Sequence, residues 1–263
     1  MPPLSSRRVG AAMSEVALLR LEGVSKTYRG GTRPAVDNLS LEVRAGEIFG
    51  FLGPNGAGKT TTIKMVVGLL KADRGTILVN GHDVARDSVA AKADIGYVPD
   101  NPDLYDRLTG IEYLNLVADI FSVPRDERRR RVAELLEMFE LESAARDIIQ
   151  SYSHGMKQKL ALTGALLHEP RVFILDEPMV GLDPRASRLF KDMMRSHCDK
   201  GHTVFFSTHI LEVAERLCDR VGIINRGRLV ACGTVEELRN RRKQADETLE
   251  DIFLELTEAG EAS

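Results

Sequence analysis

The sequence lacks the features that mark several classes of protein. It has three cysteines in 263 residues, and Cys198, Cys218 and Cys232 show no paired metal-ligand spacing. Such an odd, unpaired set is typical of reduced thiols in a cytosolic protein. No uncharged apolar run approaches the roughly 20 residues that span a bilayer, and the N-terminus has no signal-peptide core. The sequence therefore predicts a soluble chain without disulfides.

The chain also lacks an excess of positive charge. Its 36 lysines and arginines against 39 aspartates and glutamates give a net charge of -3. Proteins that bind nucleic acid normally present a clearly basic surface, so no nucleic-acid partner is predicted. One dense basic run, 128–131, falls on a predicted helix with apolar positions at Val132, Leu135, Leu136 and Phe139. This pattern favours a solvated outer face for the arginines.

Hydrophobic periodicity predicts an α/β fold with a helical insertion. Alternating apolar residues at 18–21 and 39–43 are typical of half-buried antiparallel strands. Further strands are predicted at 47–52, 75–79, 95–98, 171–176, 204–208 and 221–224, the last being the final core strand. Helices are predicted at 61–70, 111–121 and 126–140.

Changes in these patterns divide the chain into five parts. We expect a flexible leader at 1–14, an N-terminal β subdomain with the first part of the core at 15–99, a helical subdomain at 100–167, the rest of the core at 168–233, and C-terminal helices at 234–263. Thr234 and Glu237 have the spacing of a capping box that opens the last part. The apolar stripe at 249–256 is expected to dock on the domain or on a partner. Met13 also fits a translation start.

The most specific motif is Gly53-Pro54-Asn55-Gly56-Ala57-Gly58-Lys59-Thr60, which fits the pattern G-x-x-x-x-G-K-[ST]. Backbone N–H groups of such a loop must face phosphate oxygens, and its glycines leave room for that approach. Lys59 is expected to bind the β and γ phosphates, Thr60 to bind Mg²⁺, and the next helix to direct its positive end at the phosphates. A nucleoside triphosphate is the predicted ligand.

A second motif supplies two acids. The apolar stretch 172–175 ends in Asp176 and Glu177. Beside a phosphate loop, Asp176 is predicted to hold Mg²⁺ and Glu177 to accept a proton from the attacking water. The alternative is an acidic strand end that caps the next element.

Four further residues are candidates with ordinary alternatives. Ser153 begins a helix and Asp183 is a plausible helix N-cap, which are structural roles when taken alone. His209, at a strand end, can contact a γ-phosphate or the water, or be a satisfied polar cap. Tyr28 can stack on a base, or simply pack.

In order and spacing these segments resemble the ATP-binding subunits of ABC transporters, from about residue 16 to residue 238. The loop at 53–60 resembles the family's Walker A motif, and 172–176 resembles its Walker B strand. Tyr152-Ser153-His154-Gly155-Met156 resembles the family's signature. Other phosphate-loop ATPases do not carry that segment ahead of Walker B, so the signature is the most diagnostic part of the resemblance.

The resemblance implies a fold and a set of site residues. The fold is α/β, a P-loop NTPase core with a mostly parallel central sheet, an N-terminal antiparallel β subdomain and an inserted α-helical subdomain. Glu177, His209 and Lys59 are implied to be catalytic, and Asp183 to lie in the D-loop. The implied ATP-binding residues are Tyr28, Gly53, Asn55, Gly56, Ala57, Gly58, Lys59, Thr60 and Thr61.

Two such subunits pair head to tail in the family. The resemblance therefore implies that each ATP lies between Lys59 of one protomer and Ser153, His154 and Gly155 of its partner. The sequence does not indicate whether the pair is a homodimer or a heterodimer.

The sequence departs from the family pattern at two places. Asp100 stands where many members have the glutamine of the Q-loop, and its carboxylate is a candidate ligand of Mg²⁺ beside Thr60 and Asp176. His154 replaces the first glycine of the usual signature and Met156 its glutamine. Backbone contacts at the second glycine can survive this change.

The function implied by the resemblance is that of an ATP-hydrolysing subunit, with ATP and Mg²⁺, that powers a separately encoded membrane permease. The single cassette and variant signature look like the exporter branch, working at the cytoplasmic face of the membrane. One alternative is a soluble ABC-type ATPase of translation or DNA repair, which usually brings two cassettes, a long coiled coil or zinc-binding cysteines. A regulatory subunit with little turnover is another, and Asp100 leaves it open.

Overall fold

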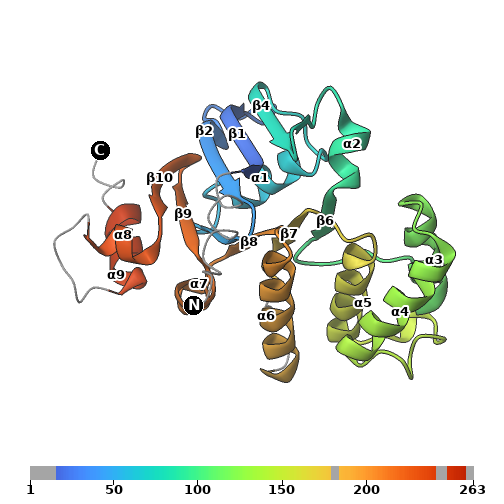
Figure 1. Ribbon diagram of the computed structural model, residues 1–263. Coiled ribbons are helices and arrows are strands. Elements are labelled where there is room, and N and C mark those ends of the chain that lie inside the picture. Colours follow the sequence, from blue (N-terminus) through green and yellow to red (C-terminus); the bar gives the residue numbers. More distant parts are fainter. Residues whose placement is uncertain (1–15, 179–183, 241–247, 259–263) are drawn as a thin grey trace, which may run out of the picture.

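The described residues form two sheets and a separate group of helices. The structure is a computed structural model that describes residues 16–178, 184–240 and 248–258. Figure 1 shows an antiparallel sheet in blue and cyan next to a mixed sheet, with α3, α4 and α5 to one side. The predicted α/β fold class is confirmed. The predicted leader at 1–14 and Asp183 lie outside the described residues.

The antiparallel sheet has the strand order β2-β1-β4-β5. Its strands are β1 (Ala17–Lys26), β2 (Val36–Arg44), β4 (Arg74–Val79) and β5 (His82–Asp83). Residues of β2 are alternately buried and exposed, as predicted, and the buried face shares an apolar cluster with the mixed sheet. Asn80 and Gly81 have φ of 48° and 83° and form the predicted tight turn before β5.

The mixed sheet has the strand order β10-β9-β3-β8-β7-β6. Its strands are β3 (Ile48–Leu52), β6 (Ile95–Val98), β7 (Val172–Asp176), β8 (Thr203–Thr208), β9 (Arg220–Asn225) and β10 (Arg228–Gly233). Every neighbouring pair is parallel except β9 with β10. All residues of β3, β7 and β8 are buried, which explains their near-continuous apolar runs.

The prediction that 221–224 is the last core strand is wrong. A turn after Asn225 leads into β10, which pairs with β9. β10 lies at the edge of the sheet and most of its residues are exposed or half-buried. Its sequence therefore has no buried apolar run to indicate a strand.

Four helices accompany the sheets, namely α1 (Lys59–Val66), α2 (Ser88–Ala93), α6 (Pro184–Asp199) and α7 (Leu211–Leu217). α1 is shorter than the predicted helix at 61–70. Gly68 has φ of 71°, and the N–H groups of Leu69 and Leu70 both donate to the Lys64 carbonyl. This left-handed glycine ends the helix before the apolar pattern ends.

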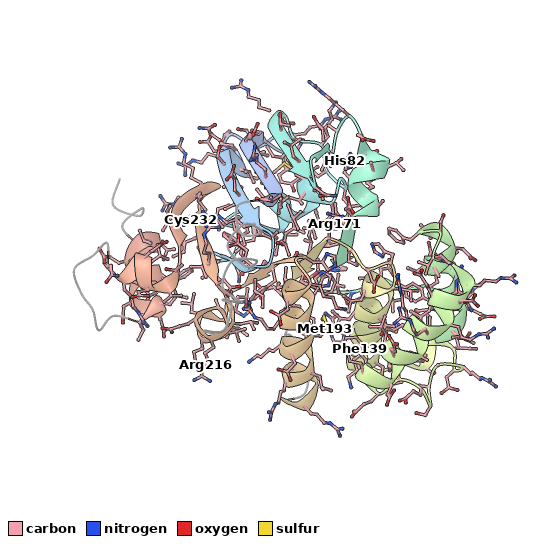
Figure 2. All side chains as sticks on the ribbon, in the orientation of Figure 1. His82, Phe139, Arg171, Met193, Arg216 and Cys232 are labelled. Atoms are coloured by element: carbon pink, nitrogen blue, oxygen red, sulfur yellow. The ribbon has the colours of Figure 1, made fainter. Side chains whose placement is uncertain are left out.

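The helical insertion consists of α3 (Gly110–Ile120), α4 (Arg125–Phe139) and α5 (His154–Leu166), after a short 3-10 turn at Ile149–Ser151. The bounds of α3 and α4 match the predicted helices to within a residue. Thr109 and Glu112 form a capping box at the start of α3. Phe139 of α4 and Met193 of α6 belong to the apolar cluster that joins the insertion to the core (Figure 2).

The prediction of a solvated face for 128–131 is wrong for two of its arginines. Arg131 donates to the Leu167 carbonyl at 3.1 Å and to the Glu169 carboxylate at 2.7 Å. Arg128 donates to Asp119. Since residues three apart share one flank of a helix, these two guanidinium groups tie α4 to its neighbours while the intervening arginines stay exposed.

The C-terminal helices are α8 (Val235–Asn240) and α9 (Leu249–Glu258). The predicted capping box is present, because the Glu237 carboxylate accepts from the Thr234 N–H and the Thr234 hydroxyl accepts from the Glu237 N–H. Leu249 and Ile252 are buried in one cluster with Leu52, so α9 docks on the domain as predicted. Among the described helices, none is both long and apolar enough to cross a bilayer.

Candidate functional site

The phosphate loop follows β3 and is pressed against the core. A Cβ at Gly58, where φ is 111°, would lie 2.5 Å from the Ala35 carbonyl oxygen. A Cβ at Gly53 would lie 2.5 Å from the Ile224 carbonyl oxygen. Both positions therefore need glycine for close packing, and Gly58 needs it for its backbone conformation as well.

Lys59 stands at the start of α1 with only 8 % of its surface exposed. Its Nζ donates to the Gly53 carbonyl at 2.6 Å. Burial lowers the pKa of its ammonium group, and the nearby Glu177 and Asp176 carboxylates counteract that shift. The loop carbonyl thus satisfies a buried cation that can be redirected to phosphate oxygens.

Asp176 lies at the end of β7, directly opposite Ser207 of β8. Burial raises the pKa of this carboxyl group, while hydrogen bonds from the hydroxyls of Ser207 and Thr60 oppose the rise. Thr60 and Asp176, which are both predicted to hold Mg²⁺, line one common cleft. A hydroxyl and a carboxylate held in this way are oxygen ligands of the kind that Mg²⁺ prefers.

Glu177 has a left-handed backbone, with φ of 50°. Its N–H lies 3.1 Å from the Ser207 hydroxyl oxygen, and its Oε2 lies 3.0 Å from Nδ1 of His209. The left-handed conformation is unfavourable for a glutamate, and such strain is often found at functional sites. Glu177 and His209, both predicted to act on the attacking water, are therefore in contact.

These groups converge on one cleft of about 260 Å³. Of the predicted site residues, it is lined by Asn55, Gly56, Gly58, Lys59, Thr60, Thr61, Asp100, Asp176 and Glu177. Tyr28 is 48 % exposed, and its hydroxyl lies 3.2 Å from the Thr61 hydroxyl oxygen. Ala57 is buried behind the loop, where its carbonyl accepts from the Gly227 N–H.

Asp100 brings a third carboxylate to the cleft, facing the phosphate loop with Asp176. Burial raises the pKa of the nearby Tyr97 to about 12, and the charges of Asp176 and Asp100 add to this rise. Within the described residues no group of three or more His, Cys, Asp or Glu side chains is arranged to hold a metal ion. The carboxylates of Asp100 and Asp176 and the Thr60 hydroxyl are oxygen donors of the kind that suits Mg²⁺.

The signature residues lie away from this cleft. The Ser153 hydroxyl caps α5 by accepting from the Met156 N–H at 3.2 Å, and both Ser153 and His154 are exposed. None of the three predicted signature residues lines the cleft. The structure brings together the Walker residues of one chain but does not bring the signature to them.

Sequence reasoning missed Ser207. This serine is fully buried, and its hydroxyl contacts both the Asp176 carboxylate and the Glu177 N–H. The signal available in the sequence is a polar residue near the carboxyl end of a buried strand, where a parallel neighbour ends in two acids.

Comparisons with known proteins point to one family. The family model described as ABC transporter matches residues 36–180. The linearmycin resistance ATP-binding protein LnrL of Bacillus subtilis is 39% identical over 85% of this chain and 71% of its own length. The Nod factor export ATP-binding protein I of Ralstonia nicotianae is 38% identical over 87% of this chain and 71% of its own length.

Two solved structures agree with these relatives. One, described as an ATP-binding subunit of an ABC transporter, has a TM-score of 0.87 and 36% identity, and covers 91% of this chain and 99% of its own. The other is a dimeric, post-hydrolysis ATP-binding cassette, MJ0796, bound to ADP and Pi. It has a TM-score of 0.72 and 27% identity, and covers 82% of this chain and 98% of its own.

Proposed function

Since the chain belongs to the ABC transporter family, as an ATP-binding subunit whose ATP hydrolysis drives transport, we propose that it powers a separately encoded membrane permease that exports its substrate. The proposal of export comes from likeness, because the names of the Bacillus and Ralstonia relatives state linearmycin resistance and Nod factor export for those proteins. We also propose the partition of the chain at 15–99, 100–167, 168–233 and 234–263.

The observation that carries the proposal is the convergence of Lys59, Thr60, Asp176 and Glu177 on one cleft. In the proposed cycle, Lys59 exchanges the Gly53 carbonyl for the β and γ phosphates of ATP. Thr60 and Asp176, with Asp100, would hold Mg²⁺, which supplies positive charge to the phosphates as negative charge develops in hydrolysis.

Glu177 is proposed as the group that accepts the proton of the attacking water. His209 holds the glutamate through the contact at 3.0 Å and leaves its second carboxylate oxygen for the water. The side chain of Glu177 is only 18% exposed, so its carboxylate is shielded from bulk solvent and kept in one place. Tyr28 is proposed to stack on the adenine at the rim of the cleft.

A second ATPase subunit is proposed to complete the site. Because Ser153 and His154 are exposed and lie outside the cleft of their own chain, they are available to a partner. The free N–H groups at the start of α5, with Gly155, suit a γ-phosphate held across the interface. Asp183, which lies outside the described residues, is proposed to belong to the D-loop. The partner is proposed to be another copy of this chain or a related subunit.

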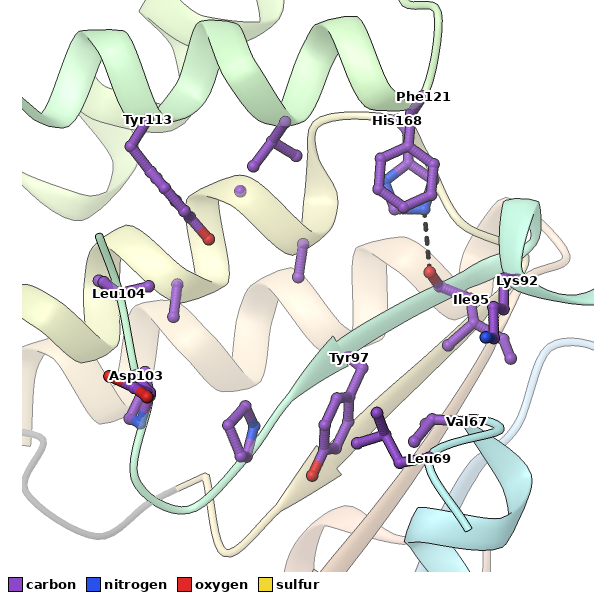
Figure 3. A pocket seen from close by; sticks show the side chains of 16 residues that line it. Val67, Leu69, Lys92, Ile95, Tyr97, Asp103, Leu104, Tyr113, Phe121 and His168 are labelled. Carbon is purple, nitrogen blue, oxygen red and sulfur yellow. Dashed lines mark hydrogen bonds between the residues drawn. The ribbon is translucent and has the colours of Figure 1, made fainter. Parts of the chain in front are cut away.

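The permease is proposed to dock in the pocket shown in Figure 3, which has a volume of about 400 Å³. The pocket lies between the core and the helical insertion, and its lining is mainly apolar, with Leu69 67% exposed at its edge. Pro99 lines the pocket, and the next residue, Asp100, lines the ATP cleft. A permease segment seated in this pocket would therefore contact the residue next to Asp100 of the ATP cleft. This docking would hold the chain at the cytoplasmic face of the membrane.

The test of the ATPase assignment is to replace Glu177 by Gln and Lys59 by Ala and to measure ATP binding and turnover separately. Glu177→Gln is expected to bind ATP as the wild type does and to lose turnover by a factor of about 100 or more. Lys59→Ala is expected to weaken ATP binding itself. Substantial turnover by the glutamine variant would remove Glu177 from its proposed role.

A further inference from the structure

One buried amide of the helical insertion has neither its donor nor its acceptor satisfied. Gln158 of α5 is 0% exposed, and within the described residues neither its Oε1 nor its Nε2 has a hydrogen-bond partner. Buried side-chain amides normally form hydrogen bonds, because desolvation without them is costly. Packing alone would be served as well by an apolar side chain of the same size.

Four other described residues have buried side-chain atoms in this condition. They are Arg128, Arg131, His168 and His197. Arg131 and His197 also line one small pocket, of about 150 Å³, between the helical insertion and α6. Unsatisfied polar atoms of Arg131 and His197 therefore meet where the insertion contacts α6. A second position of the insertion relative to α6 would allow these polar atoms to form hydrogen bonds.

Helical periodicity shows what Gln158 faces. It precedes Ala161 by three residues and Ala165 by seven, so the three share one face of α5. Both alanines line the pocket of Figure 3, together with Pro102 and Leu104. In that view Leu104 lies at one end of the pocket and His168, which follows α5, at the other. Gln158 is therefore one turn beyond the pocket, at its Leu104 end.

This position lies between two parts of the proposed ATP site. Ser153, the N-cap of α5, is five residues before Gln158 on the same helix. On the other side, the segment 101–104 follows directly from Asp100 in the cleft. Because Ser153 and Gln158 are on one rigid helix, a change in the angle of α5 relative to this segment would also move Ser153.

We propose that Gln158 is a positioning residue for ATP hydrolysis. When ATP occupies the cleft, its carboxamide forms hydrogen bonds with the backbone of 100–104, and these bonds fix the angle at which α5 presents Ser153 to the ATP of the partner subunit. The inference rests on the proposed function, since it requires the signature to act across an interface.

The test compares ATP-dependent dimerisation of the full-length chain in the Glu177→Gln background, where ATP persists. Gln158→Met keeps the volume and removes both polar atoms. We expect the dimer dissociation constant in Mg-ATP to rise about tenfold, the loss of one or two ordinary hydrogen bonds. ATP affinity of the monomer is expected to stay unchanged, and the melting temperature without ATP to stay unchanged or rise, because the buried amide has no hydrogen bond to lose until the dimer-competent arrangement forms.

Thr163→Val is the matched control on the same helix. Thr163 is also 0% exposed, but its hydroxyl is satisfied by the Lys159 carbonyl of its own helix. This variant is expected to dimerise with ATP as well as its Glu177→Gln parent. Equal dimerisation of the Gln158→Met variant and the parent would overturn the proposal, and so would a lowered melting temperature with unchanged dimerisation, which indicates a structural role.

A parent that fails to dimerise with ATP would overturn the proposed pairing, and with it this inference. If Gln158→Met folds poorly, hydrogen exchange of the Glu177→Gln parent tests whether the backbone of 100–104 gains hydrogen bonds when ATP binds. Exchange of the backbone amides at Asp103 and Leu104 is expected to slow when Mg-ATP is added. Unchanged exchange there, in a parent that does dimerise, would contradict the proposal.

Discussion

Replacing Ser207 by Ala tests how the two acids of the site are held. The Ser207 hydroxyl donates to the Asp176 carboxylate and lies 3.1 Å from the Glu177 N–H, and all three groups are at least partly buried. A buried hydrogen bond to a charged group contributes about 1.5–3 kcal/mol, and the Glu177 N–H keeps only its longer bond, to the backbone carbonyl of residue 207. We therefore expect unfolding to be easier by about 2–3 kcal/mol.

The same substitution should act on catalysis. Without Ser207 the Glu177 backbone keeps only the 3.3 Å bond from its N–H to the Ser207 carbonyl, so its carboxylate is held less firmly beside His209. We expect kcat to fall by about tenfold while ATP affinity changes little, because the phosphate loop is untouched.

The loss of stability should depend on pH. Burial raises the pKa of Asp176 above its ordinary value of 3.8, so the folded state holds this proton more tightly than the unfolded state does. The free energy of unfolding therefore falls as pH rises through the folded-state pKa. The Ser207 hydrogen bond opposes this rise, and its removal raises the pKa further. The difference in melting temperature between wild type and variant should therefore be larger at pH 8 than at pH 5.

Thermal unfolding measured at the two pH values checks this reasoning. Thr208→Val is the control on the same strand, since the Thr208 hydroxyl accepts from the Ile210 N–H and contacts neither acid. Its effect should not depend on pH in this way. A Ser207→Ala variant that loses the same stability at pH 5 and pH 8, or none, would refute the assignment of Ser207 to Asp176.

Three further substitutions have expected outcomes. Gly58→Ala should destabilise the fold by about 2–4 kcal/mol in chemical unfolding, because its Cβ would lie 2.5 Å from the Ala35 carbonyl and φ is 111°; an unchanged midpoint would contradict this. Tyr28→Ala should weaken ATP binding about tenfold by calorimetry, whereas Tyr28→Phe should keep most of it, since stacking needs the ring and not the hydroxyl. Asp100→Asn should raise the Mg²⁺ concentration needed for half-maximal ATPase activity and leave metal-free ATP binding at least as strong, because it removes a carboxylate from the cleft; an unchanged Mg²⁺ requirement would exclude Asp100 as a ligand.

The contiguous parts of the site could be predicted from the sequence. The loop at 53–60 is a single contiguous segment whose conformation depends mainly on its own residues. The spacing of its glycines, Lys59 and Thr60 is therefore enough to identify it without knowledge of tertiary contacts. Likewise, Asp176 and Glu177 are marked by the end of a buried apolar run. The antiparallel and parallel sheets followed from alternating and continuous apolar patterns, respectively.

Contacts between distant segments could not be predicted in this way. The Ser207 contact with Asp176 depends on the parallel register of β7 with β8, which places residues 31 apart in the chain opposite each other. A single residue of slip would point either side chain to the other face of the sheet. Edge strand β10 was missed because half-exposed strands carry little apolar signal, and Gln158 gave no signal because a glutamine is common on an exposed helix face.

The most direct test of the central claim, that this ATPase drives a separate permease, is a pull-down of the tagged chain from detergent-solubilised membranes of its own host, followed by mass spectrometry. A polytopic membrane protein in stoichiometric amount is the predicted result, and a Leu69→Glu variant at the edge of the proposed docking pocket should recover less of it. Recovery only in the soluble fraction, with ribosomal or DNA-repair proteins, would contradict the account while leaving the ATPase chemistry in place.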